Sequence, residues 1–370
     1  MKTKFPTKYF WMFFAFLLGL HCQVSALESS TSVAIVNIAS ASIAKWNPGH
    51  YILLYPKQSE PRYFNAVMSD LRENPIFRGV QKKYFWNKLE PTKGVYDFSE
   101  IRSDLANLAQ INRQLVLSLQ AESFITYEKL VPDYLQTDEY EGGVYPINTG
   151  RGFNVAYYNV KVQDRLVALV KALGREFDHH PNLEAINFEE TSPGRTEPEW
   201  HRAYIKKYIE GMMTVAIAAK KSFPQTVVIQ YVNYPESSLP TVMQTLLHHG
   251  IGMGGPDTVQ NNKFLAQGVY SYYPKAANEL PIGIAVDYNN YQSSVGGSGP
   301  MDRPSIESIH RFAVGALKPN YMFWLRRTKE PSNGSNYWSD VLSYFQGIYS
   351  PANPSGGLNA NCPRAVSSCS

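Results

Sequence analysis

The sequence lacks the features that mark several classes of protein. Beyond residue 26, no run is long and apolar enough to form a transmembrane helix. The formal net charge is only +4, which gives no electrostatic reason to expect a nucleic acid partner. The chain contains no P-loop, no GxGxxG, GxSxG or HExxH motif, and no other tight spacing of metal ligands. We therefore expect no metal, no cofactor and no stable membrane insertion.

The first 26 residues have the pattern of a secretion signal. Three lysines precede an apolar stretch at 11–20, which is too short to span a bilayer, and Val24-Ser25-Ala26 supplies small residues for cleavage. Cleavage after Ala26 removes three lysines and no acid, so the formal net charge falls from +4 to +1. We expect a secreted or periplasmic protein with a signal peptide (1–26), one main domain (27–350) and a tail (351–370).

Cysteine is scarce, with three residues in the whole chain, and the predicted cleavage leaves two of them. Both Cys362 and Cys369 lie in the tail, which is rich in Pro, Ser and Gly and is expected to be loose. In an oxidising compartment they could close a small loop. Such a disulfide would stabilise the C-terminal tail and would take no part in catalysis.

Eight short apolar runs alternate with helical patterns along the main domain. Alternation of this kind requires a parallel sheet, and eight units fit a single (β/α)8 barrel, a TIM barrel of the α/β class. The loops after the strands of such a barrel carry its functional site. The long polar segment 124–157 follows the third strand, and it is either a wall of the cleft or an insertion without a role. The predicted strands are 51–55, 79–86, 114–119, 183–188, 226–231, 251–255, 282–287 and 321–325. The predicted helices are about 62–73, 99–110, 160–177, 197–221, 239–248, 305–317 and 337–348.

The fourth strand ends at two adjacent carboxylates, Glu189 and Glu190, just before a Ser-Pro-Gly turn. Carboxylates at the C-terminal mouth of a barrel strand occupy the position where these barrels keep their chemistry. The alternative is a strand end whose acids only cap the next helix. We take this doublet as the centre of the site.

The second unit carries a more specific pattern, W-x-x-L-E-P-x-x-G-x-Y-D-F, from Trp86 to Phe98. Gly94 allows a tight turn, and Asp97 with Glu100 has capping-box spacing. The whole string resembles the strand-two region of clan A glycoside hydrolases. It is most similar to family 42 β-galactosidases and less closely to family 10 xylanases.

The resemblance implies a retaining glycosidase with an acid/base glutamate after strand four and a nucleophilic carboxylate after strand seven. Glu190 takes the acid/base position, and Glu189 stands where the clan usually has Asn. Asp287 stands where the clan usually has Glu. Because Asp is one carbon shorter, the gap between the carboxyls could admit a water and favour inversion. Asp257 after strand six is another candidate, and Asp287 could instead only cap a loop.

The two glutamates compete for the role of proton donor. Repulsion between adjacent carboxylates raises the pKa of one of them, as a general acid requires. Side-chain alternation along the strand points Glu189 toward the barrel axis, whereas the motif position favours Glu190. We follow the motif and assign the general acid to Glu190.

Other polar and aromatic side chains at strand ends are candidates for binding sugar. Trp86 and Trp324 could form stacking platforms, although each could equally be core packing. We expect an oligo- or polysaccharide substrate whose O-glycosidic bond is cleaved, and a catalytically inactive glycan-binding or envelope protein is the alternative. The remaining candidate binding residues are Glu122, Gln230, Asn233, Asp257, Tyr288 and Arg326.

Overall fold

The computed structural model describes residues 43–55, 61–124, 128–148, 150–296, 302–328, 336–366 and 368–369. The predicted signal peptide lies outside these residues. Eight parallel strands close into a barrel in the order β1-β10-β9-β8-β7-β6-β3-β2, which confirms the predicted (β/α)8 fold. The barrel strands are β1 (Gly49–Leu54), β2 (Phe77–Phe85), β3 (Gln114–Gln120), β6 (Leu183–Phe188), β7 (Val227–Tyr231), β8 (Gly252–Gly255), β9 (Ile282–Val286) and β10 (Tyr321–Leu325).

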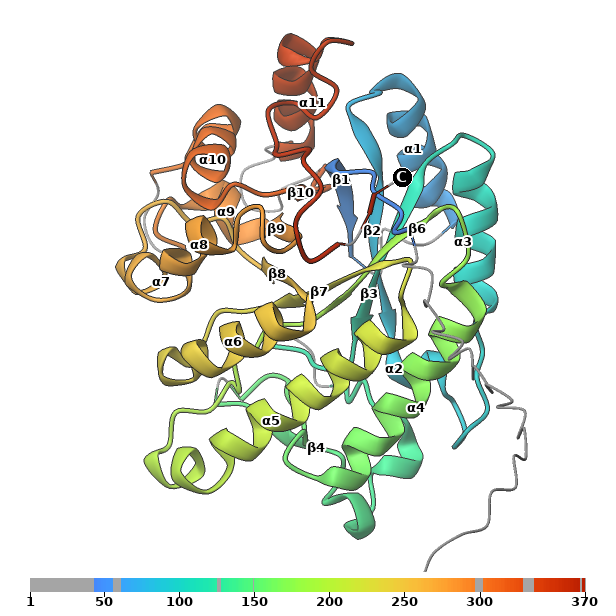
Figure 1. Ribbon diagram of the computed structural model, residues 1–370, viewed down its shortest axis with the longest axis vertical. Coiled ribbons are helices and arrows are strands. Elements are labelled where there is room, and N and C mark those ends of the chain that lie inside the picture. Colours follow the sequence, from blue (N-terminus) through green and yellow to red (C-terminus); the bar gives the residue numbers. More distant parts are fainter. Residues whose placement is uncertain are drawn as a thin grey trace, which may run out of the picture. The chain divides into compact units, whose positions relative to one another are not determined.

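Helices surround the barrel, with the long ones packed outside the strands (Figure 1). Six predicted helices are present within a few residues of their expected limits. The unit after β8 differs, because several short segments replace a single long helix. The helices are α1 (Pro61–Glu73), α2 (Trp86–Leu89), α3 (Ser99–Ala109), α4 (Val160–Phe177), α5 (Pro198–Ser222), α6 (Leu239–His249), α7 (Lys263–Gln267), α8 (Tyr273–Ala276), α9 (Tyr288–Gln292), α10 (Ile306–Phe312) and α11 (Tyr337–Ile348).

The barrel interior combines close-packed glycines with a polar layer. A Cβ on Gly254 would lie 2.4 Å from the carbonyl oxygen of Gly283, so β8 and β9 approach each other in a way that only glycine permits. Above them, the Gln81 side chain of β2 reaches across the barrel and donates to Asn187 on β6 (2.9 Å) and Tyr231 on β7 (2.7 Å). These contacts fix which residues of each strand face inward.

The tail is ordered, so the expectation of a loose terminus is wrong. It crosses the end of the barrel where the strands begin. There the Trp46 indole donates to the Ala360 carbonyl (2.9 Å), and the Arg364 N–H donates to the Asn278 carbonyl (2.8 Å). Cys362 and Cys369 form a disulfide, as the sequence allowed. No helix among the described residues is long and apolar enough to cross a membrane.

Candidate active site

Five carboxyl groups gather at the C-terminal mouth of the barrel, each just beyond the end of a strand. Closure of the barrel brings them together from four strands that are well separated in the sequence. Four of these residues are partly exposed at the mouth, and only Glu122 is buried. The five are Glu122 after β3, Glu189 and Glu190 after β6, Asp257 after β8 and Asp287 after β9.

Glu189 is bound on the β3 side of the mouth. Its Oε2 accepts the backbone N–H groups of Glu122 (3.0 Å) and Ala121 (3.3 Å). Desolvation raises the pKa of Glu189 to about 7, even though Lys83 and the two N–H donors oppose the shift. Its own carbonyl accepts the side-chain amide of Gln230 (2.5 Å). Glu189 is therefore held firmly by the neighbouring strands.

Glu190 faces the opposite side of the mouth, toward β7 and β8. Asn233 lies beside its carboxyl group and opposes the rise of its pKa, and Asp257 is the acid whose charge acts on it most strongly. Desolvation, followed by the charge of Asp257, raises the pKa of Glu190 to about 8. The strand ends at Phe188, so strict alternation no longer governs the direction of Glu190. Glu190 is thus largely protonated at neutral pH while lying at the open mouth.

Asp257 and Asp287 form the next part of the acidic side. Burial, followed by the charge of Asp287, raises the pKa of Asp257 to about 6, and the Asn290 amide donates to its Oδ1 (2.9 Å). The Tyr55 hydroxyl contacts both carboxyl oxygens of Asp287. Asp287 also caps α9, where it accepts the N–H of Tyr288. The orientation of the Asp287 carboxylate is therefore fixed from two sides.

Glu122 is buried beside Glu189, and neither of its carboxyl oxygens has a hydrogen-bond partner among the described residues. Burial, followed by the charge of Glu189, raises its pKa well above the usual range. Only 3% of the residue is exposed, so the carboxyl does not reach the mouth as a sugar-binding group would. The prediction that Glu122 binds substrate is therefore wrong, and its carboxyl lies behind that of Glu189.

A cavity of about 320 Å³ opens beside Asp257, between the loops that follow β7, β8 and β9. This volume lies at the lower end of the roughly 300–1,000 Å³ typical of small-molecule sites. Its walls mix aromatic rings with amide and carboxyl groups, a combination suited to a ligand with many hydroxyls. The polar and aromatic lining residues are Asn233, Tyr234, Asp257, Asn262, Tyr270, Tyr273 and Asn289.

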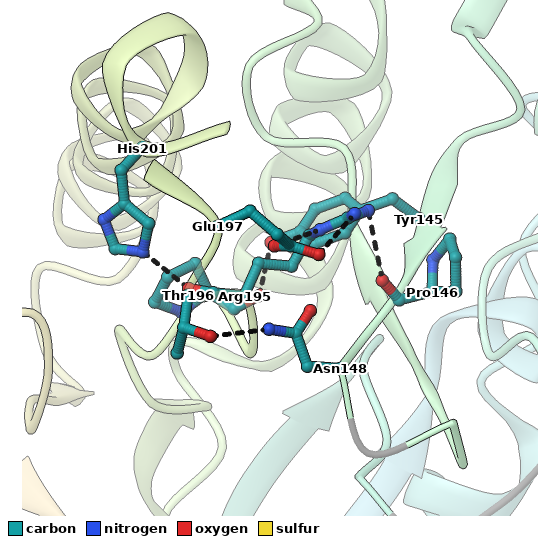
Figure 2. A network of polar contacts seen from close by, with 8 residues as sticks. Tyr145, Pro146, Asn148, Arg195, Thr196, Glu197 and His201 are labelled. Carbon is teal, nitrogen blue, oxygen red and sulfur yellow. Dashed lines mark hydrogen bonds and ion pairs between the residues drawn. The ribbon is translucent and has the colours of Figure 1, made fainter. Parts of the chain in front are cut away.

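The loop that follows Glu190 is fastened to the insertion after β3, whose strands β4 (Val144–Pro146) and β5 (Phe153–Val155) form a small antiparallel sheet. Arg195 pairs with Glu197 (2.9 Å), and its guanidinium lies over the Tyr145 ring (Figure 2). In the same network the Asn148 amide contacts the Thr196 hydroxyl (2.8 Å). The insertion is thereby packed against the loop that carries the central carboxyls.

Several predicted binding residues do not reach the mouth. Trp86 and Trp324 are fully buried, so the prediction that they form sugar platforms is wrong. The Trp324 indole donates to His50 on the outer side of the barrel, because Phe323 takes the inward position. The same alternation turns Arg326 outward into an ion pair with Asp70 (2.7 Å), where it cannot touch a sugar.

Gln230 is also buried, and its amide donates to two backbone carbonyls. It therefore supports Glu189 and is not free to bind substrate, which corrects the prediction. Asn233 and Asp257 do line the cavity. Tyr288 is half-buried, with the Arg327 guanidinium 4.8 Å above its ring.

Three residues that the sequence patterns did not single out also lie at the mouth: Lys83 on β2, Tyr55 just after β1 and Arg327 just after β10. Alternation could have identified Lys83, because it has the same parity as Gln81 on one strand. The part of the chain that the structure describes contains no group of three or more His, Cys, Asp or Glu side chains placed to hold a metal ion.

No protein-family model and no curated protein matches this sequence. The fold is similar to that of solved glycoside hydrolases. One is the catalytic domain of β-amylase from Paenibacillus polymyxa, with a TM-score of 0.59 and 9% identity over 84% of this chain and 100% of that one. Another is the β-galactosidase from the psychrophilic Marinomonas ef1, with a TM-score of 0.56 and 9% identity over 84% of this chain. A third is a catalytic mutant of a family 42 β-galactosidase from G. stearothermophilus, with a TM-score of 0.56 and 11% identity over 86% of this chain.

This chain spans 61% and 59% of the lengths of those two β-galactosidases. At such low identity the likeness establishes the barrel fold alone. The expected similarity to (β/α)8 glycoside hydrolases, family 42 among them, is confirmed at that level.

Proposed function

We propose that this protein is a glycoside hydrolase in which Glu190 is the general acid. The observation that carries the proposal is the carboxyl group of Glu190 at the barrel mouth, beside Asn233 and Asp257, with a pKa raised to about 8. Glycoside cleavage requires one protonated and one ionised carboxyl group flanking the scissile bond. Similar barrels in a β-amylase and in β-galactosidases support a carbohydrate substrate.

The second carboxylate is Asp287, whose orientation is fixed by Tyr55 and by the first turn of α9. Retention requires the nucleophile to attack the sugar directly, whereas inversion places a water between the carboxylate and the sugar. We expect a retaining reaction, with inversion as the alternative because Asp287 has the shorter side chain. The anomer released first, followed by NMR, distinguishes the two.

The decisive experiment compares Glu190→Gln with its neighbour Glu189→Gln on a panel of aryl glycosides and polysaccharides. Gln keeps the shape of the side chain but cannot deliver a proton, so Glu190→Gln should lower turnover by roughly 10²–10⁴-fold. An aryl glycoside with a very acidic leaving group needs little protonation, so its first bond-breaking step should be spared. Full activity of Glu190→Gln on natural glycan, with loss in Glu189→Gln, would reverse the assignment.

A glycan-binding barrel without turnover is the second candidate. Its support is the helix-capping role of Asp287, which alone explains why a carboxylate stands at that position. Such a protein would bind oligosaccharides in calorimetry and release no reducing ends from any of them. Its affinity would be the same in the wild type and in Asp287→Asn, provided that Asp287→Asn keeps the α9 cap.

Secretion is part of the same proposal and rests on residues 1–26. N-terminal sequencing of the exported protein should give a chain that begins at Leu27. A product that retains the first 26 residues would contradict it.

A further inference from the structure

Lys83 places an unpaired positive charge at the acidic mouth. Like Gln81, it lies on the inner face of β2, and its ammonium sits 5.2 Å from the ring centroid of Tyr55. The side chain is partly exposed. Within the described part of the chain it forms no hydrogen bond and no ion pair. The adjacent Lys82 points outward and, in contrast, is paired with both Asp104 and Glu100.

The nearby carboxyl groups do not serve as ion-pair partners for the Lys83 ammonium. Lys83 acts on Glu122, Glu189 and Glu190, but desolvation is the largest influence on all three. Burial raises the pKa of Glu122 well above its usual range, that of Glu189 to about 7 and that of Glu190 to about 8. Glu189, which carries the most charge of the three at neutral pH, directs its Oε2 to the N–H groups of Ala121 and Glu122. The Lys83 ammonium therefore has no direct ion-pair partner among these carboxyls.

The position of Lys83 suits an anionic group on a ligand. An ammonium group offers three donors on a flexible stem, and contact with Tyr55 restricts that stem. One positive charge matches one negative charge. A dianion such as phosphate would also be repelled by Asp257 and Asp287 across the mouth. The Arg327 guanidinium, over the Tyr288 ring, adds positive potential on the far side of Tyr55.

We propose that Lys83 binds the carboxylate of a uronic acid residue, so that the protein acts on an acidic glycan. The proposal rests on the glycosidase function proposed above. It makes Lys83 a determinant of specificity, across the mouth from Asp257. A sulfate ester of the same charge is the other possible source of the anion.

The test uses 4-nitrophenyl uronides beside hexosides of the same ring and anomeric configuration, in the gluco and galacto series, with a 6-sulfated hexoside as a third arm. The wild type should favour one uronide over its hexoside. Lys83→Met should lower kcat/KM for that uronide by roughly 10- to 100-fold, the effect of losing a hydrogen bond to a charged group, and change the hexoside little. Lys83→Arg should restore part of the preference. Lys88→Met makes the same charge change at an exposed site on α2 and is the matched control.

Equal losses on uronide and hexoside in Lys83→Met would overturn the proposal, because Lys83 would then act only on the catalytic carboxyls. A preference for the sulfated sugar over the uronide would overturn the assignment to a carboxylate. Calorimetry on Glu190→Gln separates this proposal from the proposed function. Tighter binding of oligouronides than of neutral oligosaccharides, lost in Lys83→Met, supports the proposal even without hydrolysis. Binding of neutral oligosaccharides at least as tight as that of oligouronides overturns it, whether or not the wild type is active.

Discussion

At the scale of single residues, desolvation is the main cause of the raised pKa values of four carboxyl groups at the mouth, those of Glu122, Glu189, Glu190 and Asp257. The Glu122 carboxyl has no hydrogen-bond partner among the described residues, and burial shifts it toward the neutral form. Two backbone N–H groups partly offset the rise in the pKa of Glu189. The charge of Asp257 raises the pKa of Glu190 further. Environments that push carboxyl pKa values apart are how one site can hold both an acid and a base.

The upper limit of the pH profile should belong to Glu190. If Glu190 delivers a proton, kcat/KM should fall as the pH rises through about 8, where its carboxyl ionises. Asp257→Asn removes a negative charge that raises the pKa of Glu190, so this upper limb should move to lower pH. The measurement is kcat/KM between pH 4 and 10 in both proteins. An unchanged limb in Asp257→Asn would show that another group titrates there, and complete inactivity would make Asp257 itself a catalytic carboxylate.

Glu122 should make the fold sensitive to alkaline pH. Its pKa is raised in the folded state, so the folded protein holds a proton that the unfolded chain releases above about pH 4.3. The stability that this carboxyl contributes is complete below that pH and declines as the pH rises toward the folded pKa. Glu122→Gln cannot ionise, so its melting temperature relative to the wild type should be higher at pH 8 than at pH 5, by about 2 °C or more.

Thermal melts at the two pH values measure this effect. Glu199→Gln on the exposed surface of α5 is the control and should follow the wild type. Parallel curves for Glu122→Gln and the wild type would contradict the prediction.

At the scale of elements, β2 is joined to α3 by a buried ion pair. Lys82 and Asp104 are 2% and 8% exposed at their side chains, and the Tyr84 hydroxyl donates to the same Asp104 oxygen (2.6 Å). The outward face of β2 therefore presents a charged side chain to a helix.

Lys82→Met should destabilise the protein by about 3–5 kcal/mol, because Asp104 would be left buried without its cation. A second change, Asp104→Leu, should recover most of that loss by removing the unpaired charge. Urea unfolding of the wild type, the single variant and the double variant measures the effect. A cost below about 1 kcal/mol for the single change would show that Asp104 can be protonated without penalty.

At the scale of the whole molecule, the two ends of the barrel have separate tasks. The C-terminal mouth carries the candidate site, and the ordered tail covers the N-terminal end. There, a Cβ on Gly356 would lie 2.7 Å from the His50 ring. The disulfide between Cys362 and Cys369 closes a short loop, with a sequence separation of 7.

Replacing both cysteines by serine should lower stability by up to roughly 2–3 kcal/mol, the loop-closure value for a loop of this length. Turnover should be unchanged, because the tail lies at the opposite end of the barrel from the mouth. Thermal melts and kinetics on the double variant, with and without reductant, measure both. A loss of turnover larger than the loss of folded protein would contradict this separation of the two ends.

The sequence by itself determined the fold. Apolar runs at 183–188 and 321–325 are short, lie between helical patterns and coincide with β6 and β10, because burial on both faces of a parallel strand leaves a continuous apolar signal. The helices at 160–177 and 337–348 were predicted with the same limits, since their apolar periodicity and polar ends are local properties. Glu189, Glu190, Asp257 and Asp287 each follow a predicted strand, so the sequence also placed all four at the same end of the barrel.

Only the tertiary structure decided what each side chain faces. Trp324 and Arg326 turn outward and Arg327 turns toward the mouth, because Phe323 fills the interior of the barrel. The effect of the Asp257 charge on Glu190 depends on distances between strands far apart in the sequence. So does the lack of a hydrogen-bond partner for the Glu122 carboxyl among the described residues. A sequence pattern encodes the period of a strand, but the direction of a side chain beyond the strand's last residue is set by its neighbours across the barrel.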